Sequence, residues 1–373
     1  MTSGDVGNFR DRNASFLVRG AATIAGQGLL YIFGMLLLLV LTFVVLGIAP
    51  LNGISQLWTG AVGSAADGRL YPLSATLVES APLMLAAISV CIAWRAGLFS
   101  IGAQGQIMIG GLAATAIYHE FSAMPAPVIT LSMLVCAAAG GAFWGLIAGW
   151  LRVRRGVQEV ISTIMLNYVA LYVVSWLVLG PLRAKGNYLA ETDSLPNSVL
   201  FARLIPSAWS DHIQTTLHLG VVLALFVPPA AFLFMYRSRA GFNMRILGNN
   251  DEAARVARLP TEQLKMWAMG VSGGIAGLAG AILLLGSATG SLPATSFGGS
   301  IGFTAIPVAL LGGLHPLGSL FSALFFGGLT QGCRNLEQNT GVSSVVIYVI
   351  QATAVLAVVG ARAVRERRET APA

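Results

Sequence analysis

The sequence predicts an all-α fold, a polytopic membrane helix bundle of about ten transmembrane helices with broken or re-entrant segments. Its composition predicts this class, because 55% of the 373 residues are hydrophobic and only 10% are charged. A soluble globular domain carries roughly 25% charged residues, so this chain has too few charges to cover a surface that faces water. The length suits many spans of roughly 20 residues each, and the mean hydropathy of +0.76 agrees.

The transmembrane helices are expected where apolar residues follow one another almost without charge. These runs span residues 29–48, 73–93, 98–118, 127–150, 160–179, 219–236, 266–287, 301–313, 317–332 and 342–360. The first is too long for the core of a signal peptide and no convincing cleavage site follows it, so we expect it to be retained. The third is rich in glycine, and the eighth and ninth are short and interrupted by glycine and proline. Such segments are expected to be broken helices that line a cavity, where irregular backbone is tolerated at membrane depth.

The basic residues predict the orientation of the bundle. If the N-terminus is cytoplasmic and all ten runs cross, 17 of the 22 basic residues face the cytoplasm. They are Arg10, Arg12, Arg19, Arg95, Arg152, Arg154, Arg155, Arg237, Arg239, Arg245, Arg255, Arg258, Lys265, Arg362, Arg365, Arg367 and Arg368. The opposite side holds Arg69, Arg183, Lys185, Arg203 and Arg334. This split follows the positive-inside rule. The net charge of +7 is therefore attributed to topology, and no nucleic-acid partner is expected.

The runs divide the chain into a cytoplasmic N-terminal tail (1–28), a transmembrane domain (29–360) and a cytoplasmic C-terminal tail (361–373). Within the transmembrane domain, two segments outside the membrane have some size. One is the outer loop 181–218 and the other is the cytoplasmic loop 237–265. Neither is long enough to hold a soluble domain of its own.

The cytoplasmic loop contains the sequence GNNDEAARVARLP at 248–260, which predicts a short surface helix. Asn249 or Asn250 can cap a helix that begins at Asp251 and that Pro260 stops, and acidic residues followed by arginines complement the helix dipole. The helix is either a solvated linker or a docking element for a cytoplasmic partner. Ala253, Ala254 and Ala257 would give a docking helix a small-residue face. Ala254→Asp is then expected to clash with that partner while the membrane fold survives.

Four polar residues within the spans are candidates for a translocation pathway: Glu79, Gln104, Gln106 and Asn167. Polar groups at membrane depth need partners, so these side chains are expected to face the protein interior. The alternative for the amides is that they bond neighbouring helices. The alternative for Glu79 is that it lies near the outer third of its span, solvated or paired.

Two further patterns have structural interpretations. Glu159, at the cytoplasmic end of its span, is expected to form an ion pair with Arg154 or Arg155. The glycines Gly273, Gly274, Gly277 and Gly280 recur at helical spacing, which is typical of close helix packing in membranes.

Catalytic and cofactor chemistry is not indicated. The four histidines are scattered and the three cysteines lie far apart, so neither a metal site nor a catalytic cluster is expected. A Walker-type phosphate loop needs the dipeptide Gly-Lys, and neither Lys185 nor Lys265 follows a glycine. If the protein uses ATP, another chain hydrolyses it. We therefore expect a transporter subunit rather than an enzyme, and no cofactor.

Four motifs in order give a resemblance that covers most of the chain. They are GLFSIGAQGQ (97–106), VQEVISTIMLNYVALY (157–172), NNDEAARVARLP (249–260) and IPVALLGGLHPLGS (306–319). Together they resemble inner-membrane permease subunits of ATP-binding-cassette (ABC) importers, in the family of branched-chain amino-acid, ribose and nucleoside permeases. The nucleoside group is the most similar. Gln104 stands where the family often has glutamate, and Pro307 and Val308 replace a usual valine and alanine.

The resemblance implies a multi-pass protein of the bacterial inner membrane that forms the pathway for a small molecule. It implies three partners: a cytoplasmic ABC ATPase, a second homologous permease or a copy of the same chain, and an extracytoplasmic substrate-binding protein. The short cytoplasmic helix would be the coupling helix that docks on the ATPase. Its residues are Asp251, Glu252, Ala253, Ala254, Arg255, Ala257 and Arg258.

The substrate is left open among several classes. Nucleosides are polar and uncharged, which suits a pathway with amides and few charges. Branched-chain amino acids and monosaccharides are alternatives within the same class of importer. A secondary transporter coupled to ions or protons would need carboxylates within the membrane, and only Glu79 plainly qualifies. Co-purification of a cytoplasmic ATPase would separate an ABC importer from that alternative.

Overall fold

The computed structural model describes residues 37, 40–44, 47–63, 70–186, 188–204, 216–295, 297–341, 348–352 and 356. The chain divides into two compact units, Met1–Gln56 with Glu337–Ala373, and Leu57–Leu336. The second unit contains the residues discussed below. Regular structure in the described part is α-helical, and two isolated β-bridges pair single residues.

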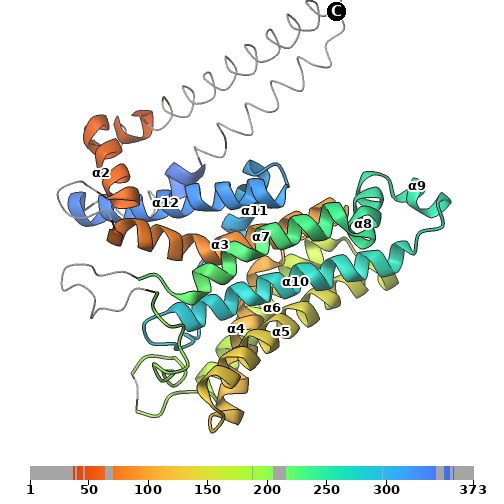
Figure 1. Ribbon diagram of the computed structural model, residues 1–373, viewed down its shortest axis with the longest axis horizontal. Coiled ribbons are helices and arrows are strands. Elements are labelled where there is room, and N and C mark those ends of the chain that lie inside the picture. The colour runs from red at the N-terminus through yellow and green to blue at the C-terminus, as the bar shows by residue number, and fades with distance from the viewer. Residues whose placement is uncertain are drawn as a thin grey trace, which may run out of the picture. The chain divides into compact units, whose positions relative to one another are not determined.

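Eleven helices follow one another in the part of the chain that the structure describes. They are α2 (Pro50–Val62), α3 (Leu70–Arg95), α4 (Ala103–Phe121), α5 (Ala126–Arg155), α6 (Glu159–Leu179), α7 (Leu219–Arg237), α8 (Arg239–Asn249), α9 (Asp251–Val256), α10 (Thr261–Gly286), α11 (Ile301–Leu311) and α12 (Pro316–Thr340). In Leu57–Leu336, α8 and α9 lie at one end, which we call the α9 end. The connection that follows α6 lies at the other end, which we call the opposite end (Figure 1).

Five helices of the described part are long and apolar enough to cross a membrane: α3, α5, α6, α7 and α10. They coincide with five of the predicted runs, those at 73–93, 127–150, 160–179, 219–236 and 266–287. The third run begins in irregular backbone, because α4 starts only at Ala103. The first and last runs lie largely outside the described residues, so the total of about ten spans stays a prediction.

The eighth and ninth runs form a short helix and a longer one. Since a helix rises 1.5 Å per residue, the 11 residues of α11 cover about 17 Å, and the apolar core of a bilayer is about 30 Å thick. Helix α12 extends past the ninth run, which ends at residue 332, to Thr340, so Arg334 lies on this helix. The sequence changes from apolar to polar near Gln331, but that change alters hydropathy and not helix formation.

Close backbone contacts hold α10 against its neighbours. A Cβ atom on Gly277 would overlap the carbonyl oxygen of Ala137 in α5, and one on Gly280 would overlap that of Ile107 in α4. Gly273 packs in the same way on Gly141 of α5, so close packing is confirmed for three glycines of the stripe and is not observed for Gly274. Figure 1 shows α10 running alongside α5, and α10 also contacts α3 and α4.

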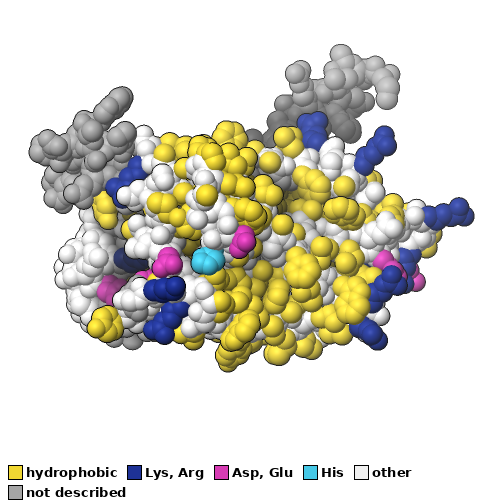
Figure 2. Space-filling model, turned by 90° about the horizontal axis from the view of Figure 1, so that it is seen from below, with side chains coloured by type: hydrophobic (Ala, Val, Ile, Leu, Met, Phe, Trp, Pro, Cys, Tyr) yellow, Lys and Arg dark blue, Asp and Glu magenta, His cyan; other side chains and the backbone are white. Residues whose placement is uncertain are grey.

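The surface matches a protein that lies in a membrane. Figure 2 shows a face that is largely hydrophobic, with lysine and arginine side chains mostly towards its two ends. Large apolar side chains on the described helices are exposed, such as Phe143, Tyr172 and Phe226. Exposed apolar area on this scale needs an apolar surrounding, which a bilayer provides.

Candidate functional site

The loop at the α9 end folds into two capped helices, where the sequence predicted one. The hydroxyl of Ser238 accepts a hydrogen bond from the N–H of Gly241 at the start of α8. Asn250 Oδ1 accepts from the N–H groups of Glu252 and Ala253, both at 3.0 Å, and so caps α9. Asn249, the other candidate cap, is the last residue of α8.

Helix α9 is shorter than predicted, because it ends at Val256 and not at Arg258. Arg258 has a left-handed backbone with φ 58°. The N–H of Leu259 bonds to the carbonyl of Ala254, which is the closing pattern of a Schellman motif. Pro260 disfavours helical backbone at the residue before it, so the helix closes before the proline rather than at it.

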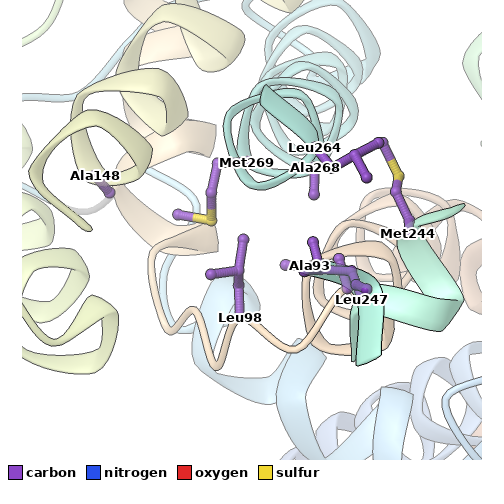
Figure 3. Packing of buried hydrophobic residues seen from close by; sticks show 10 residues of the cluster. Ala93, Leu98, Ala148, Met244, Leu247, Leu264, Ala268 and Met269 are labelled. Atoms are coloured by element: carbon purple, nitrogen blue, oxygen red, sulfur yellow. The ribbon is translucent and has the colours of Figure 1, made fainter. Parts of the chain in front are cut away.

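Ala254 faces the protein's own core, which overturns its assignment to the docking face. Its side chain is 0% exposed and packs in a cluster with Met244, Leu247 and Leu264. Figure 3 shows these neighbours converging from α8 and α10, with Ala93 of α3 close by. Ala254→Asp would therefore bury a charge inside this chain. This burial argues against the expectation that its fold would survive the change.

The outward face of α9 carries a residue that sequence reasoning missed. Val256 is 82% exposed, and Glu252, Ala253 and Arg255 beside it are exposed as well. A valine that is exposed to this degree on a surface helix contributes little to this chain's own packing. Its residue type alone gave no sign of this, since valine is usually buried.

Asp251 ties α9 to α10. Its Oδ2 lies 2.8 Å from Lys265 Nζ and 3.4 Å from Arg255 Nη2. The hydrogen bond from Lys265 is the main cause that lowers the pKa of the Asp251 carboxyl from its usual value. A lowered pKa in the folded state gives stability above the ordinary aspartate pKa, which is lost as the pH falls through the lowered value. This carboxylate is 43% exposed, so the contribution is small.

The link between α3 and α4 joins three parts of the chain at the α9 end. A Cβ on Gly248 would overlap the carbonyl oxygen of Arg95, so α8 can lie here only with glycine at this position. The Arg95 side chain donates from Nε to the carbonyl of Leu314 at 2.8 Å and from Nη2 to that of Gly313 at 3.1 Å. Arg95 therefore connects the α8–α9 loop to the turn between α11 and α12.

The buried amides bind backbone groups of neighbouring segments. Asn167 Oδ1 accepts from the N–H of Gly105, and its Nδ2 donates to the carbonyl of Ile101, both at 2.9 Å. Gln104 Oε1 accepts from the N–H of Gly302 at 2.9 Å. Both side chains are buried, as expected. Their bonds to the backbone favour helix packing, the alternative role.

Gln106 differs from the other two amides. Its side chain is also buried, but its Oε1 has no hydrogen-bond partner among the described residues, and the same holds for Nε1 of Trp144. A buried polar atom without a partner is costly and calls for an explanation, such as a bound molecule or a functional role. Gln106 thus keeps a free acceptor inside the bundle.

Asn167→Leu tests the packing role. The two side chains are of similar size, but leucine leaves the N–H of Gly105 and the carbonyl of Ile101 without their partner. We expect a loss of about 2–6 kcal/mol in stability, since each of the two buried groups left without a partner costs about 1–3 kcal/mol. Thermal unfolding in detergent measures it. Tyr168→Leu, at an exposed position of the same helix, is the control. Equal melting temperatures for the two variants would contradict the packing role.

Glu159 forms an ion pair, but with a different arginine from those expected. Its Oε2 lies 3.1 Å from Arg152 Nε, and its Oε1 accepts a hydrogen bond from the N–H of Phe99 at 3.3 Å. The partner is neither Arg154 nor Arg155, because α5 points these two side chains outward and turns Arg152 towards α6. Glu159 therefore helps to hold the link between α3 and α4.

A cavity of about 540 Å³ opens near the opposite end. Glu79 lies on its wall and pairs with Arg334 through two contacts, 3.0 Å to Nη1 and 3.1 Å to Nη2. The paired alternative for Glu79 is therefore the one observed. The other polar side chains of the wall include Tyr71, Asn197, Thr216, Ser287 and Gln331. Sequence reasoning missed them, because they come from distant segments that only the fold brings together.

His218 closes one side of this cavity. Its ring stacks on Phe201 with centroids 5.6 Å apart, and its Nδ1 accepts from the N–H of Gly220. Burial lowers the pKa of His218 from its ordinary value, so the ring is neutral near pH 7. An acceptor role for Nδ1 agrees with the neutral form.

The comparison with protein families decides the identity of the chain. A model described as "Branched-chain amino acid transport system / permease component" matches residues 73–355. The chain belongs to this permease family. The resemblance seen in the four motifs is thereby confirmed.

Three relatives of this permease are informative. Guanosine ABC transporter permease protein NupP of Bacillus subtilis is 33% identical over 87% of this chain and 90% of its own length. Nucleoside ABC transporter permease protein NupB of Lactococcus lactis is 30% identical over 86% of each chain. Glucose ABC transporter permease protein TsgB13 of Haloferax volcanii is 34% identical over 77% of this chain and 75% of its own. The permease is thus a subunit of an ABC transporter and not itself an enzyme.

The four motifs of this permease are neighbours in space. Asn167 of the second motif holds the backbone of the first, and Gly248 brings the third against Arg95, just before the first. Arg95 in turn holds the glycine turn of the fourth. The sequence showed these motifs as separate segments, and the structure shows that they form one assembly around the link between α3 and α4.

Proposed function

We propose that this permease forms the transmembrane pathway of an ABC importer for nucleosides, with ATP hydrolysed by a separate ATPase chain. The names of two relatives support nucleosides as the substrate class. NupP is named as a guanosine permease and NupB as a nucleoside permease, and both align with most of the chain. A monosaccharide is the second candidate, because TsgB13 is as similar over a smaller share of the chain.

We place the α9 end in the cytoplasm and the opposite end outside it, in the inner membrane of a bacterium. The positive-inside rule supports this orientation, since the basic residues of α5, α7, α8 and α9 gather at the α9 end. The outward face of α9 would then meet the ATPase, and the opposite end would receive the substrate-binding protein. A second permease, homologous or identical, would complete the pathway.

The cavity beside Glu79 is a candidate entrance for the substrate. Its volume lies within the usual range of ligand pockets, roughly 300–1,000 Å³. Asn197, Gln331 and Ser287 offer donors and acceptors for the hydroxyls and base edges of a nucleoside. Glu79 and Arg334 neutralise each other, so this pair does not attract a charged substrate. The wall also carries the cation of Arg203, so its polar groups suit a polar molecule, and the uptake competition below separates a nucleoside from an amino acid.

Deeper in the bundle, Gln106 is the strongest of the amide candidates for the pathway, because its free acceptor could bind a passing hydroxyl. Gln104 and Asn167 keep a place in the proposal as residues that hold the pathway's wall, through their bonds to Gly302 and to the link between α3 and α4.

Uptake measurements test the proposed substrate. Cells that lack other nucleoside uptake and that express this permease with its partner permease, its ATPase and its binding protein should accumulate radiolabelled guanosine or uridine. Cells with an inactivated ATPase should not. Unlabelled nucleosides should compete, whereas glucose and leucine should not. Competition by glucose alone would favour the monosaccharide alternative, and uptake that continues without ATP hydrolysis would contradict an ABC importer.

A further inference from the structure

A groove of about 750 Å³ lies between α5 and α10 on the outside of the bundle. Small residues form its floor, among them Ala138 and Ala142 of α5 and Gly274 of α10. A Cβ on Gly274 would meet its neighbours only at ordinary contact distances, 3.4 Å to the carbonyl oxygen of Ala138 and 3.6 Å to Ala142, so α10 does not press its backbone against α5 here. The groove therefore remains open beside the tightly packed seam at Gly277.

Charged side chains gather at one mouth of this groove, at the α9 end. Arg154, from the last turn of α5, and Glu262, from the first turn of α10, both line it and both are exposed. Neither has an ion-pair or hydrogen-bond partner in the described part of the chain. By contrast Arg152, two residues earlier, is held by Glu159. The mouth thus presents one unpaired cation and one unpaired anion.

Two tryptophans mark the depth of the groove. Trp150 and Trp267 line it next to the charged mouth, and both are exposed. Tryptophan side chains gather where the apolar core of a bilayer meets the headgroups. At 1.5 Å per residue, the lining beyond them extends about 18 Å along α5 to Ala138 and about 10 Å along α10 to Gly274. This is comparable to one leaflet, about half of a 30 Å core.

We propose that this groove binds a phosphatidylethanolamine molecule of the leaflet at the α9 end. One acyl chain lies along the alanines and glycines, the phosphate contacts Arg154 and the primary ammonium donates to Glu262. The inference depends on α5 and α10 crossing the membrane, and does not depend on which small molecule the permease carries.

The headgroup decides the choice of lipid, because any acyl chain fills an apolar groove about equally well. Phosphatidylcholine has the same charges, but its quaternary ammonium has no N–H to donate to Glu262. Phosphatidylglycerol offers a phosphate to Arg154 but no cation, which leaves Glu262 facing a like charge. A mouth with unpaired charges of both signs therefore matches a zwitterion with a primary amine.

Native mass spectrometry of the full chain measures this preference. The purified protein is titrated with phosphatidylethanolamine, phosphatidylcholine and phosphatidylglycerol of identical acyl chains. We expect phosphatidylethanolamine to bind about tenfold more tightly than phosphatidylcholine, as expected for one hydrogen bond to a charged group. Glu262→Leu removes the acceptor and should remove this preference, Glu262→Gln removes only the charge and should reduce it, and Arg154→Gln should weaken the binding of all three lipids.

Matched variants separate the groove from the general surface. Arg155→Gln removes the neighbouring exposed arginine, which does not line the groove, and should leave binding unchanged. Ala139→Phe fills the groove and should abolish lipid retention, whereas Val135→Phe, on the exposed surface of α5 outside the lining, should not.

Three results would overturn the proposal. The first is equal affinity for phosphatidylethanolamine and phosphatidylcholine. The second is a preference for phosphatidylglycerol that Glu262→Gln strengthens, which would indicate an anionic lipid. The third is a disulfide between two copies of Ala139→Cys, formed in native membranes, which would show that a second permease covers this face. None of these outcomes bears on nucleoside uptake, so the two proposals can fail separately.

Discussion

Gly277→Ala is expected to destabilise the permease strongly, whereas Gly274→Ala, three residues earlier on the same helix, should leave it unchanged or slightly more stable. The new Cβ at 277 would overlap the backbone carbonyl of Ala137, while at 274 the nearest atom is 3.4 Å away. A carbonyl cannot move aside as a flexible side chain can, so α5 and α10 would have to separate along their seam.

The two variants make the same change to intrinsic helix propensity, which favours alanine over glycine by about 1 kcal/mol. Their difference therefore measures packing alone. Overpacking a well-packed interior typically costs about 1–3 kcal/mol, and a contact between two backbones belongs at the upper end of that range or beyond it. The effect should spread through the unit, since α10 also contacts α3 and α4.

Thermal unfolding in detergent, followed by tryptophan fluorescence, checks this expectation, and the yield of monodisperse protein provides a second reading. Equal melting temperatures for Gly277→Ala and Gly274→Ala would show that α10 has room for a methyl group at position 277. That result would contradict the role of Gly277 in close helix packing.

Val256→Asp is expected to abolish uptake and co-purification of the ATPase while the permease inserts and folds normally. Val256 is 82% exposed on a helix that Asn250 caps and Asp251 anchors to α10, so this chain loses no internal contact. If the valine fills a pocket on the ATPase, a carboxylate there would be buried without a partner. Such losses at the centre of an interface reach about 2 kcal/mol or more, which is about thirtyfold in affinity.

Two comparison variants sharpen this test. Val157→Asp places the same charge on an exposed residue at the same end of the bundle, outside α9, and should keep most of the uptake. Ala254→Asp should lose uptake for a different reason, because the charge falls within the core cluster and lowers the melting temperature. Normal uptake and ATPase binding by Val256→Asp would contradict a docking role for α9 and would favour the alternative, a solvated linker.

Much of the fold could be predicted from the sequence. The spans at 73–93, 127–150, 160–179, 219–236 and 266–287 appear as helices close to those bounds, because hydropathy over some 20 residues reflects a bilayer whose thickness is fixed. A cap at Asn249 or Asn250 and the packing glycines of α10 could also be predicted, because both depend on residue types at short spacing along one helix.

The structure of the loop 237–265 could be predicted only in part from the sequence. Helix α8 was missed, because its apolar residues Met244 and Leu247 pack only in the context of α3 and α10. The buried side of α9 was misassigned for the same reason. Three alanines on a short helix look alike in sequence, but only Ala254 points into the core.

By itself, the sequence determined that this chain is a helical membrane permease, because composition, charge asymmetry and local motifs act over short stretches of chain. Only the tertiary structure decided which side chains meet. It paired Glu79 with Arg334 and Glu159 with Arg152, brought four separate motifs to the link beside Arg95, and left Arg154 and Glu262 unpaired at the mouth of one groove. These contacts depend on how helices that are distant in sequence pack against one another. No single segment of the chain determines that packing.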